Sequence, residues 1–169
     1  MKLICSYCHR IINEVDTGEP DRVSHGMCEG CFRDFSFRWR SQPLGRYLDG
    51  FDMPVLIVDG TCRIIAANQE MADMIGRPER EIKGLLGGEG MECVYSRREE
   101  GCGKDVHCST CAIRNSITHT ARTGETLNRV ECYVEGEAGK ETYQISTVKV
   151  GRSIQVVFEP APGKKVGES

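Results

Sequence analysis

Ten of the 169 residues are cysteines, and eight of these fall into two groups whose spacing suits metal binding. The first group forms two C-x2-C pairs, Cys5 with Cys8 and Cys28 with Cys31. Each pair forms a tight turn that directs two thiolates at one ion, and two such turns complete a tetrahedron around zinc. We predict a zinc-ribbon-like module in residues 1–32, because so short a segment needs the free energy of metal binding to fold.

A haem site is the alternative for the first pair. Cys5, Cys8 and His9 also match the C-x-x-C-H attachment motif of c-type haem. Haem attachment of this kind normally follows export, and the N-terminus lacks the apolar run of a signal peptide. Haem would also leave the second C-x2-C pair unexplained, so zinc is the better interpretation.

The second group has the spacing C-x8-C-x5-C-x2-C and comprises Cys93, Cys102, Cys108 and Cys111. Four thiolates that converge on one site could hold zinc, an iron–sulfur cluster or another soft metal, and His107 could replace one of them. The spacing does not match the common ferredoxin patterns. Buried free thiols or a reversible disulfide switch are the alternatives.

The elements that must position these groups can be read from residue 51 onward. A turn signal at Asp59-Gly60 separates two short apolar runs, and Asn68 and Gly76 have the residue types of helix caps. We expect Cys62 and Cys132 to be small core residues. The expected elements are strands over 54–58 and 62–67, helices over 68–76 and 78–83, a flexible loop over 84–90, a helix over 108–123, and strands over 127–135, 140–150 and 153–158. This order predicts an α+β domain whose antiparallel sheet carries its helices on one side.

The stretch from Tyr47 to Pro160 resembles the PAS family. The resemblance rests on four motifs in order: Leu48-Asp49-Gly50-Phe51-Asp52-Met53-Pro54 leading into Ile57-Val58-Asp59, then Ile64-Ile65-Ala66-Ala67-Asn68, then Ile75-Gly76-Arg77, and later Thr123-Gly124-Glu125. It implies a five-stranded sheet of order 2-1-5-4-3 and a pocket between sheet and helices. Members of the family bind small ligands, flavin, haem or metal there, or pair with partner proteins.

Both cysteine groups also carry a resemblance. Ser24-His25-Gly26-Met27-Cys28-Glu29-Gly30-Cys31 is similar to zinc-ribbon-like modules that precede some bacterial PAS domains. Residues 92–114 resemble an insertion found in a cysteine-rich subgroup of PAS sensors. The expected organisation is a zinc-ribbon-like module at 1–32, a helical connector at 33–50, a PAS domain at 51–160 and a disordered tail at 161–169.

Composition and missing motifs narrow the function. The net charge of −3 gives no general attraction to nucleic acid or to an anionic membrane, and no run approaches the length of a membrane span. We expect a cytoplasmic protein, where reducing conditions favour metal or redox chemistry over structural disulfides. The chain has no P-loop, nucleophile elbow or kinase motif, so we do not expect an enzyme.

The expected function is therefore a signal-transduction sensor that binds metal or a small ligand, or senses redox state. It would pass its state to a partner kinase or regulator, and PAS-mediated pairing into a homodimer is also expected. One alternative is a zinc-ribbon nucleic-acid-binding transcriptional regulator, because aromatic residues alternate with Arg38 and Arg40 after the first cysteine group. The other alternative is an iron–sulfur redox protein.

Overall fold

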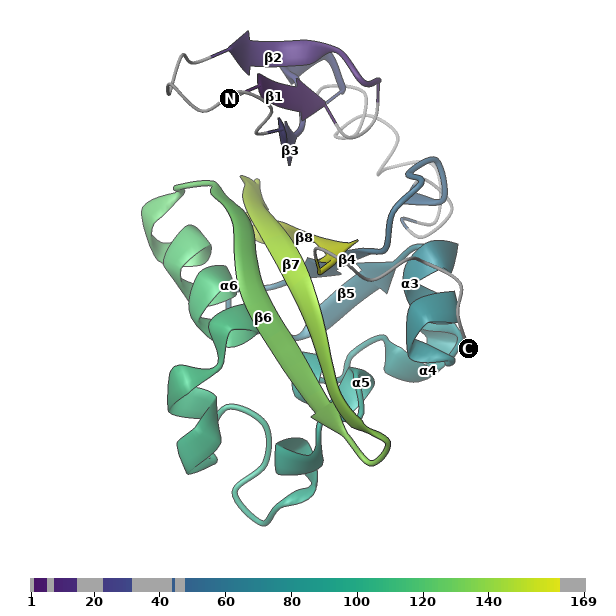
Figure 1. The fold of residues 1–169 in the computed structure, drawn as a ribbon, viewed down its shortest axis with the longest axis vertical. Coiled ribbons are helices and arrows are strands. Elements are labelled where there is room, and N and C mark those ends of the chain that lie inside the picture. Colours follow the sequence, from purple (N-terminus) through teal and green to yellow (C-terminus); the bar gives the residue numbers. More distant parts are fainter. Residues whose placement is uncertain (1, 6–7, 15–22, 32–43, 45–47, 162–169) are drawn as a thin grey trace.

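The computed structural model of the chain describes residues 2–5, 8–14, 23–31, 44 and 48–161. It contains two sheets, a small one at the N-terminus and a larger one that carries the helices (Figure 1). The expected helical connector at 33–50 falls mostly outside the described residues, as do Arg38 and Arg40. The expected disordered tail lies outside them from residue 162 onward.

The N-terminal sheet has the strand order β2-β1-β3. Its strands are β1 (Lys2–Cys5), β2 (Ile11–Glu14) and β3 (Val23–Gly26). The central strand β1 pairs antiparallel with β2 and parallel with β3, and this register places Cys5 opposite Gly26. The sheet therefore places the first C-x2-C pair beside the start of the second pair.

The larger sheet has the order β5-β4-β8-β7-β6, and every pair in it is antiparallel. Numbered along this domain alone, the order is 2-1-5-4-3, which confirms the predicted PAS-type α+β fold. The strands are β4 (Val55–Val58), β5 (Ile64–Ala67), β6 (Leu127–Gly136), β7 (Gly139–Val150) and β8 (Ser153–Pro160).

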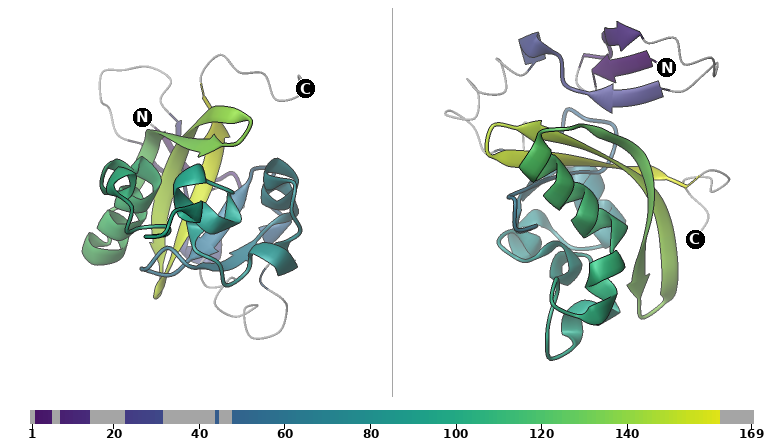
Figure 2. Two further views of the ribbon diagram at one scale, coloured as in Figure 1. Left: turned by 90° about the horizontal axis from the view of Figure 1, so that it is seen from below. Right: turned by 90° about the vertical axis from the view of Figure 1, so that its left-hand side faces the viewer.

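The helices cover one face of this sheet (Figure 2). They are α3 (Gln69–Ile75), α4 (Glu79–Ile82), α5 (Gly87–Gly90), the 3-10 turns η1 (Val94–Arg97) and η2 (Val106–Thr110), and α6 (Ala112–Thr123). Alternate strand residues such as Leu56 and Val58 pack with Ile117 of α6 into the inner core. None of the described helices is long and apolar enough to cross a membrane.

The N-cap of α3 also ties the helix to the sheet. Asn68 is 1% exposed, and its Oδ1 accepts the backbone N–H groups of Val55 (2.9 Å) and Met71 (3.0 Å). Its amide donates to the carbonyl oxygens of Met53 (2.7 Å) and Leu48 (3.4 Å). The helix ends at Gly76, which adopts the left-handed conformation with φ 77°, as predicted.

Two sequence expectations about helices were wrong. The stretch 84–90 is not a flexible loop throughout, because α5 forms within it and the Glu89 carboxylate accepts the backbone N–H of Leu86 (2.8 Å). Its glycines allow close packing: a Cβ on Gly90 would lie 2.6 Å from Cδ1 of Ile64. The helix expected from residue 108 instead starts at Ala112, after the separate turn η2.

The outer face of the large sheet is also apolar and covered. Val55, Ile57 and Val157 are at most 2% exposed and pack with Leu48 from the segment before β4. Met27, the residue before Cys28, packs against this cluster, and β3 contacts β6 and β7. The N-terminal sheet therefore lies against the outer face, opposite the helices (Figure 2).

Candidate functional site

The four N-terminal cysteines converge on one point. The Sγ atoms of Cys5, Cys8, Cys28 and Cys31 all lie within 4.8 Å of one another. The Sγ atoms of Cys8 and Cys28 are 3.7 Å apart. A tetrahedral zinc ion with bonds of about 2.3 Å would separate its sulfur ligands by about 3.8 Å. The predicted ligands are thus in the geometry that could hold zinc.

Backbone N–H groups support these sulfurs. Cys28 donates its N–H to Sγ of Cys5 (3.4 Å), and Cys31 donates to Sγ of Cys28 (3.4 Å). Such bonds stabilise thiolates, because the donor dipoles point at the negative sulfur. Burial, with hydrogen bonds from the neighbouring thiols, raises the pKa of Cys31, so metal binding at this site must displace a proton.

The four cysteines of the second group come from four different segments. Cys93 precedes η1, Cys102 lies in the following loop, Cys108 is in η2, and Cys111 is the N-cap of α6. All four line one cavity of about 70 Å³, and Cys62 lines it as well. We call this space the thiol cavity. All ten cysteines of the chain are in its described part, and none forms a disulfide.

These four thiols are more widely spaced than the N-terminal ones. Among the described residues, only the N-terminal group brings three or more metal-binding side chains within 4.8 Å of one another. The four sulfur atoms of the second group line a space and do not converge on a single point. That these four residues bind metal remains a prediction.

Glycines set the shape of this cavity. A Cβ on Gly88 would lie 2.7 Å from Sγ of Cys102, so Gly88 makes room for that sulfur. Gly103 has φ 87° and donates its N–H to Sγ of Cys108 (3.2 Å). The left-handed conformation at Gly103 favours glycine, so the loop that aims these two thiols depends on it.

A cationic side chain adjoins the thiols. Arg114 of α6 lines the cavity, and a Cβ on Gly103 would lie 2.3 Å from its guanidinium carbon. Its Nη1 atom is buried without a hydrogen-bond partner in the described part of the chain. A guanidinium N–H group that is buried without an acceptor is costly, and a negatively charged group in the cavity would offset that cost.

The thiols themselves are neutral where they are buried. Burial raises the pKa of Cys62 to about 11, against the opposing charge of Arg114. Burial also raises the pKa of Cys102. Cys62 and Cys132 are each 3% exposed, which agrees with their expected place in the core. No pattern in the sequence indicated that Cys62 also borders the thiol cavity.

The residues fit a thiolate-ligated metal or small cluster better than an organic cofactor. Thiolate donors are soft ligands that select zinc, copper(I) or iron–sulfur centres, all of which would carry negative charge once four thiolates bind. Arg114 is then a counter-charge. A cavity of about 70 Å³ is well below the about 300–1,000 Å³ of pockets that hold drug-sized organic ligands.

A histidine stands on the outer side of the same cysteines. His107 directs Nδ1 at Oδ1 of Asp105 (2.8 Å), whose carboxylate also accepts the backbone N–H of His107 (2.9 Å). Both hydrogen bonds lower the pKa of Asp105, and the backbone one has the larger effect. The carboxylate is therefore ionised at neutral pH. Sequence reasoning named His107 as a possible ligand but missed Asp105 and Arg114.

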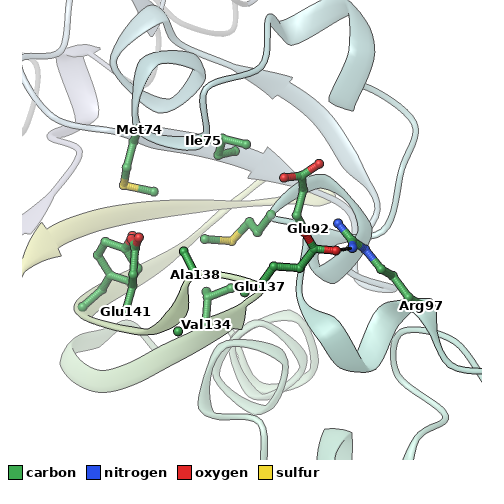
Figure 3. Close-up of a pocket in the computed structure, with 12 residues that line it drawn as sticks. Met74, Ile75, Glu92, Arg97, Val134, Glu137, Ala138 and Glu141 are labelled. Atoms are coloured by element: carbon green, nitrogen blue, oxygen red, sulfur yellow. Dashed lines mark hydrogen bonds and ion pairs between the residues drawn. The ribbon is translucent and has the colours of Figure 1, made fainter. Parts of the chain in front are cut away.

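A second, larger pocket opens beside the thiol cavity. It has a volume of about 320 Å³ and lies between α3 and the β6–β7 hairpin (Figure 3). Glu92 and the ion pair of Glu137 with Arg97 stand at one end, and Met74 at the other. Met91 and Val134 line both pockets. This pocket is large enough for a small organic ligand.

Comparison with known families finds a PAS match over part of the chain. Residues 44–107 match the family described as "PAS domain". No curated protein matches the chain. The match covers the segment from the start of the domain to His107, which includes two cysteines of the second group.

Several solved structures share this fold. The PAS domain of nitrogen regulation protein NR(II) from Vibrio parahaemolyticus is 10% identical, with a TM-score of 0.51 over 72% of this chain and 100% of that chain. The photoactive yellow protein domain of the sensor histidine kinase Ppr from Rhodospirillum centenum is 13% identical, with a TM-score of 0.50 over 73% and 97%. The LOV protein of Rhodobacter sphaeroides is 15% identical, with a TM-score of 0.50 over 71% and 65%. At these identities the likeness shows the fold alone.

Proposed function

Because the chain carries a PAS domain, we propose that it is a signalling sensor whose thiol cavity holds a thiolate-ligated metal centre. The four-cysteine N-terminal module would hold a structural zinc ion. Changes in the occupancy or oxidation state of the thiol centre would be the signal, and a partner kinase or regulator would receive it.

The single observation that carries this proposal is the thiol cavity. Five cysteine side chains from separate segments line it, and the buried Nη1 of Arg114 faces no partner. Chance packing of small core residues would leave this half-buried guanidinium with an unsatisfied N–H group, which requires compensation. A centre of net negative charge would supply that compensation.

The spacing of the sulfurs bears on the kind of centre. A single zinc ion needs its four thiolates about 3.8 Å apart, which the N-terminal group provides and the second group does not. Thiolates around an iron–sulfur cluster bind different iron atoms and stand farther apart than ligands of one ion. An iron–sulfur cluster is thus the form of the centre that needs the least movement of these side chains, and it would make the sensor redox-active.

The likeness to sensor domains supports the signalling part of the proposal. The Vibrio and Rhodospirillum structures are domains of a nitrogen regulation protein and of a sensor histidine kinase. The N-terminal module covers part of the outer face of the sheet. A signalling partner or a second copy of the chain could therefore bind only the part that stays exposed. We therefore place the partner at the edge of the contact between the N-terminal module and the sheet.

Metal analysis and an absorption spectrum of the full chain, purified without air, test the proposal. One zinc per chain with iron and a brown chromophore would support a cluster, and two zinc per chain without colour would support a second zinc site. The matched variant is Cys93→Ser with Cys111→Ser, which should lose only the second centre, whereas Cys132→Ser should lose neither. A single zinc and no other metal in the wild-type chain would refute the metal centre.

A further inference from the structure

The pocket of about 320 Å³ between α3 and the β6–β7 hairpin has an apolar middle (Figure 3). We call this space the hairpin pocket. Met74 and Ile75 of α3 line it on one side and Val134 of β6 on the other. All three side chains are only partly buried, whereas most aliphatic side chains of the neighbouring core are almost completely buried. Covering such open apolar surface favours a ligand with an apolar body.

Carboxylates lie at both ends of this apolar middle. Glu92 lies at one end and Glu141 at the other (Figure 3). A third carboxylate, that of Glu137, is already paired with Arg97, the one cation among the described residues that line the pocket. Neither Glu92 nor Glu141 forms an ion pair with a described residue. The hairpin pocket therefore carries uncompensated negative charge at two separate points.

The backbone and a tyrosine position these two carboxylates. Glu92 follows the C-cap of α5 and has φ 55°, a left-handed conformation that is costly for a residue with a side chain. Glu141 accepts a hydrogen bond from the hydroxyl of Tyr143. The ring of Tyr143 packs edge-on against Phe158 of the core, with ring centroids 5.9 Å apart. Glu141 is thus tied to the core, and the ring that holds it adds an aromatic surface that attracts cations.

We propose that the hairpin pocket binds a linear aliphatic diamine, with one ammonium group at Glu92 and the other at Glu141. The methylene chain lies along Met74 and Ile75 in this arrangement. Ammonium groups complement unpaired carboxylates, and hydrogen bonds between two charged groups are stronger than neutral ones. An amine with a single charge would pair at one end only, and a dianion would be repelled at both ends.

The hairpin pocket is distinct from the thiol cavity, although Met91 and Val134 line both. Neither Glu92 nor Glu141 lines the thiol cavity, and no cysteine is among the described residues that line the hairpin pocket. The inference is therefore independent of the metal centre under the proposed function. Diamine binding by a chain without a second metal would leave the inference intact, and a metal centre without diamine binding would refute the inference alone.

Three probes of equal chain length test this assignment on the full, zinc-loaded chain. Hexamethylenediamine carries two ammonium groups, hexylamine carries one, and adipate carries two carboxylates. In isothermal titration calorimetry the diamine should bind about fivefold more tightly than the monoamine, because only the diamine forms the second ion pair. Adipate should not bind, and added salt should weaken the diamine more than the monoamine.

Charge variants identify the two ends. Glu92→Gln and Glu141→Gln should each lower the affinity for the diamine to that for hexylamine. Arg97→Gln should act in the opposite direction, because it frees Glu137 and removes the opposing charge, and the diamine should then bind about two- to fivefold more tightly. Loss of folding cannot produce this gain. Glu100→Gln is the matched control, since Glu100 is exposed and does not line the pocket, and it should change nothing.

Three results would overturn the inference. The first is that none of the probes binds to the full chain. The second is equal affinity for hexamethylenediamine and hexylamine, which would mean that only one charged end is recognised. The third is that Glu100→Gln weakens diamine binding as much as Glu92→Gln does, which would reduce the effect to the general charge of the chain.

Discussion

Replacing Gly88 with alanine should destabilise the chain through one contact, that with Cys102. A Cβ at Gly88 would lie 2.7 Å from the sulfur of Cys102, whereas a Cβ at Gly87 would have the carbonyl oxygen of Cys62 as its nearest neighbour, at 3.7 Å. Both glycines are in α5, so the two substitutions differ in packing and share the change in helix propensity. Gly87→Ala is therefore the control for Gly88→Ala.

The magnitude follows from two opposing effects. Alanine is favoured over glycine within a helix by roughly 0.5–1 kcal/mol. Forcing a methyl group into a filled site costs about 1–3 kcal/mol. Gly87→Ala should thus raise the free energy of unfolding by up to about 1 kcal/mol, and Gly88→Ala should lower it by about 0.5–2 kcal/mol.

A double-mutant cycle isolates the contact. Cys102→Ala alone removes one buried sulfur and should cost about 1 kcal/mol. In the double variant the methyl of the new alanine at position 88 occupies the space that the sulfur left, so the two changes should couple favourably by about 1–3 kcal/mol. Urea unfolding of the zinc-loaded chain, followed by circular dichroism, measures all four proteins. Equal stability of Gly88→Ala and Gly87→Ala would refute the packing of Cys102 described above.

Three further predictions concern the core and the N-terminal module. Asn68→Ala should lower the free energy of unfolding by about 2–4 kcal/mol, because it removes a helix cap and leaves the buried N–H of Val55 unpaired; Gln69→Ala, on the exposed side, should change it by less than about 0.5 kcal/mol in the same urea assay. Burial raises the pKa of Cys62 to about 11 and that of Cys132 to about 12. The stability linked to these shifts is fully present below the pKa of cysteine in the unfolded chain, and it is lost as the pH rises through about 11. Both thiols should therefore escape iodoacetamide at pH 8 by mass spectrometry and react in urea, and equal rates in the two conditions would contradict their burial. Met27→Ser should lower stability by about 1–2 kcal/mol and increase binding of an apolar dye without loss of zinc, because it uncovers the outer face of the sheet; unchanged dye binding would count against the contact.

Local patterns predicted most of the fold. Asn68 and Gly76 bound a helix in the sequence because capping depends on a side-chain oxygen and on a residue that accepts the left-handed conformation. Along β6, Val130, Cys132 and Val134 alternate with more exposed residues, as the period of a strand requires. The convergence of the four N-terminal cysteines was also predictable, because each C-x2-C pair sets its own geometry and only two pairs had to meet.

The second site was harder to predict because its parts meet through tertiary packing. Cys62 lies about thirty residues before Cys93, and backbone hydrogen bonds through α5, from Gly87 N–H to Cys62 O (2.9 Å) and from Cys93 N–H to Gly88 O (2.8 Å), bring the two to one cavity. The glycines of 84–90 indicate flexibility by composition, whereas in the structure they allow Cys102 and Ile64 to approach the backbone closely. The charge of Arg114 and the hydrogen bond of Asp105 to His107 depend on positions that no local pattern reveals.

The two cysteine sites lie on opposite faces of one sheet, and β6 belongs to the surroundings of both. Tyr133 and Val134 of β6 line the thiol cavity, while β3 of the N-terminal sheet contacts β6 and β7 from the other face. Side chains alternate across a strand, so a shift of β6 that makes room at the cavity also moves the residues that meet β3. A zinc ion bound to Cys28 would hold β3 and Met27 in place, because Cys28 directly follows Met27. The backbone N–H of Cys28 also donates to Sγ of Cys5. A change at the thiol centre would then act on a rigid contact between β3 and β6. Such rigidity allows a local change to shift a second surface between two states.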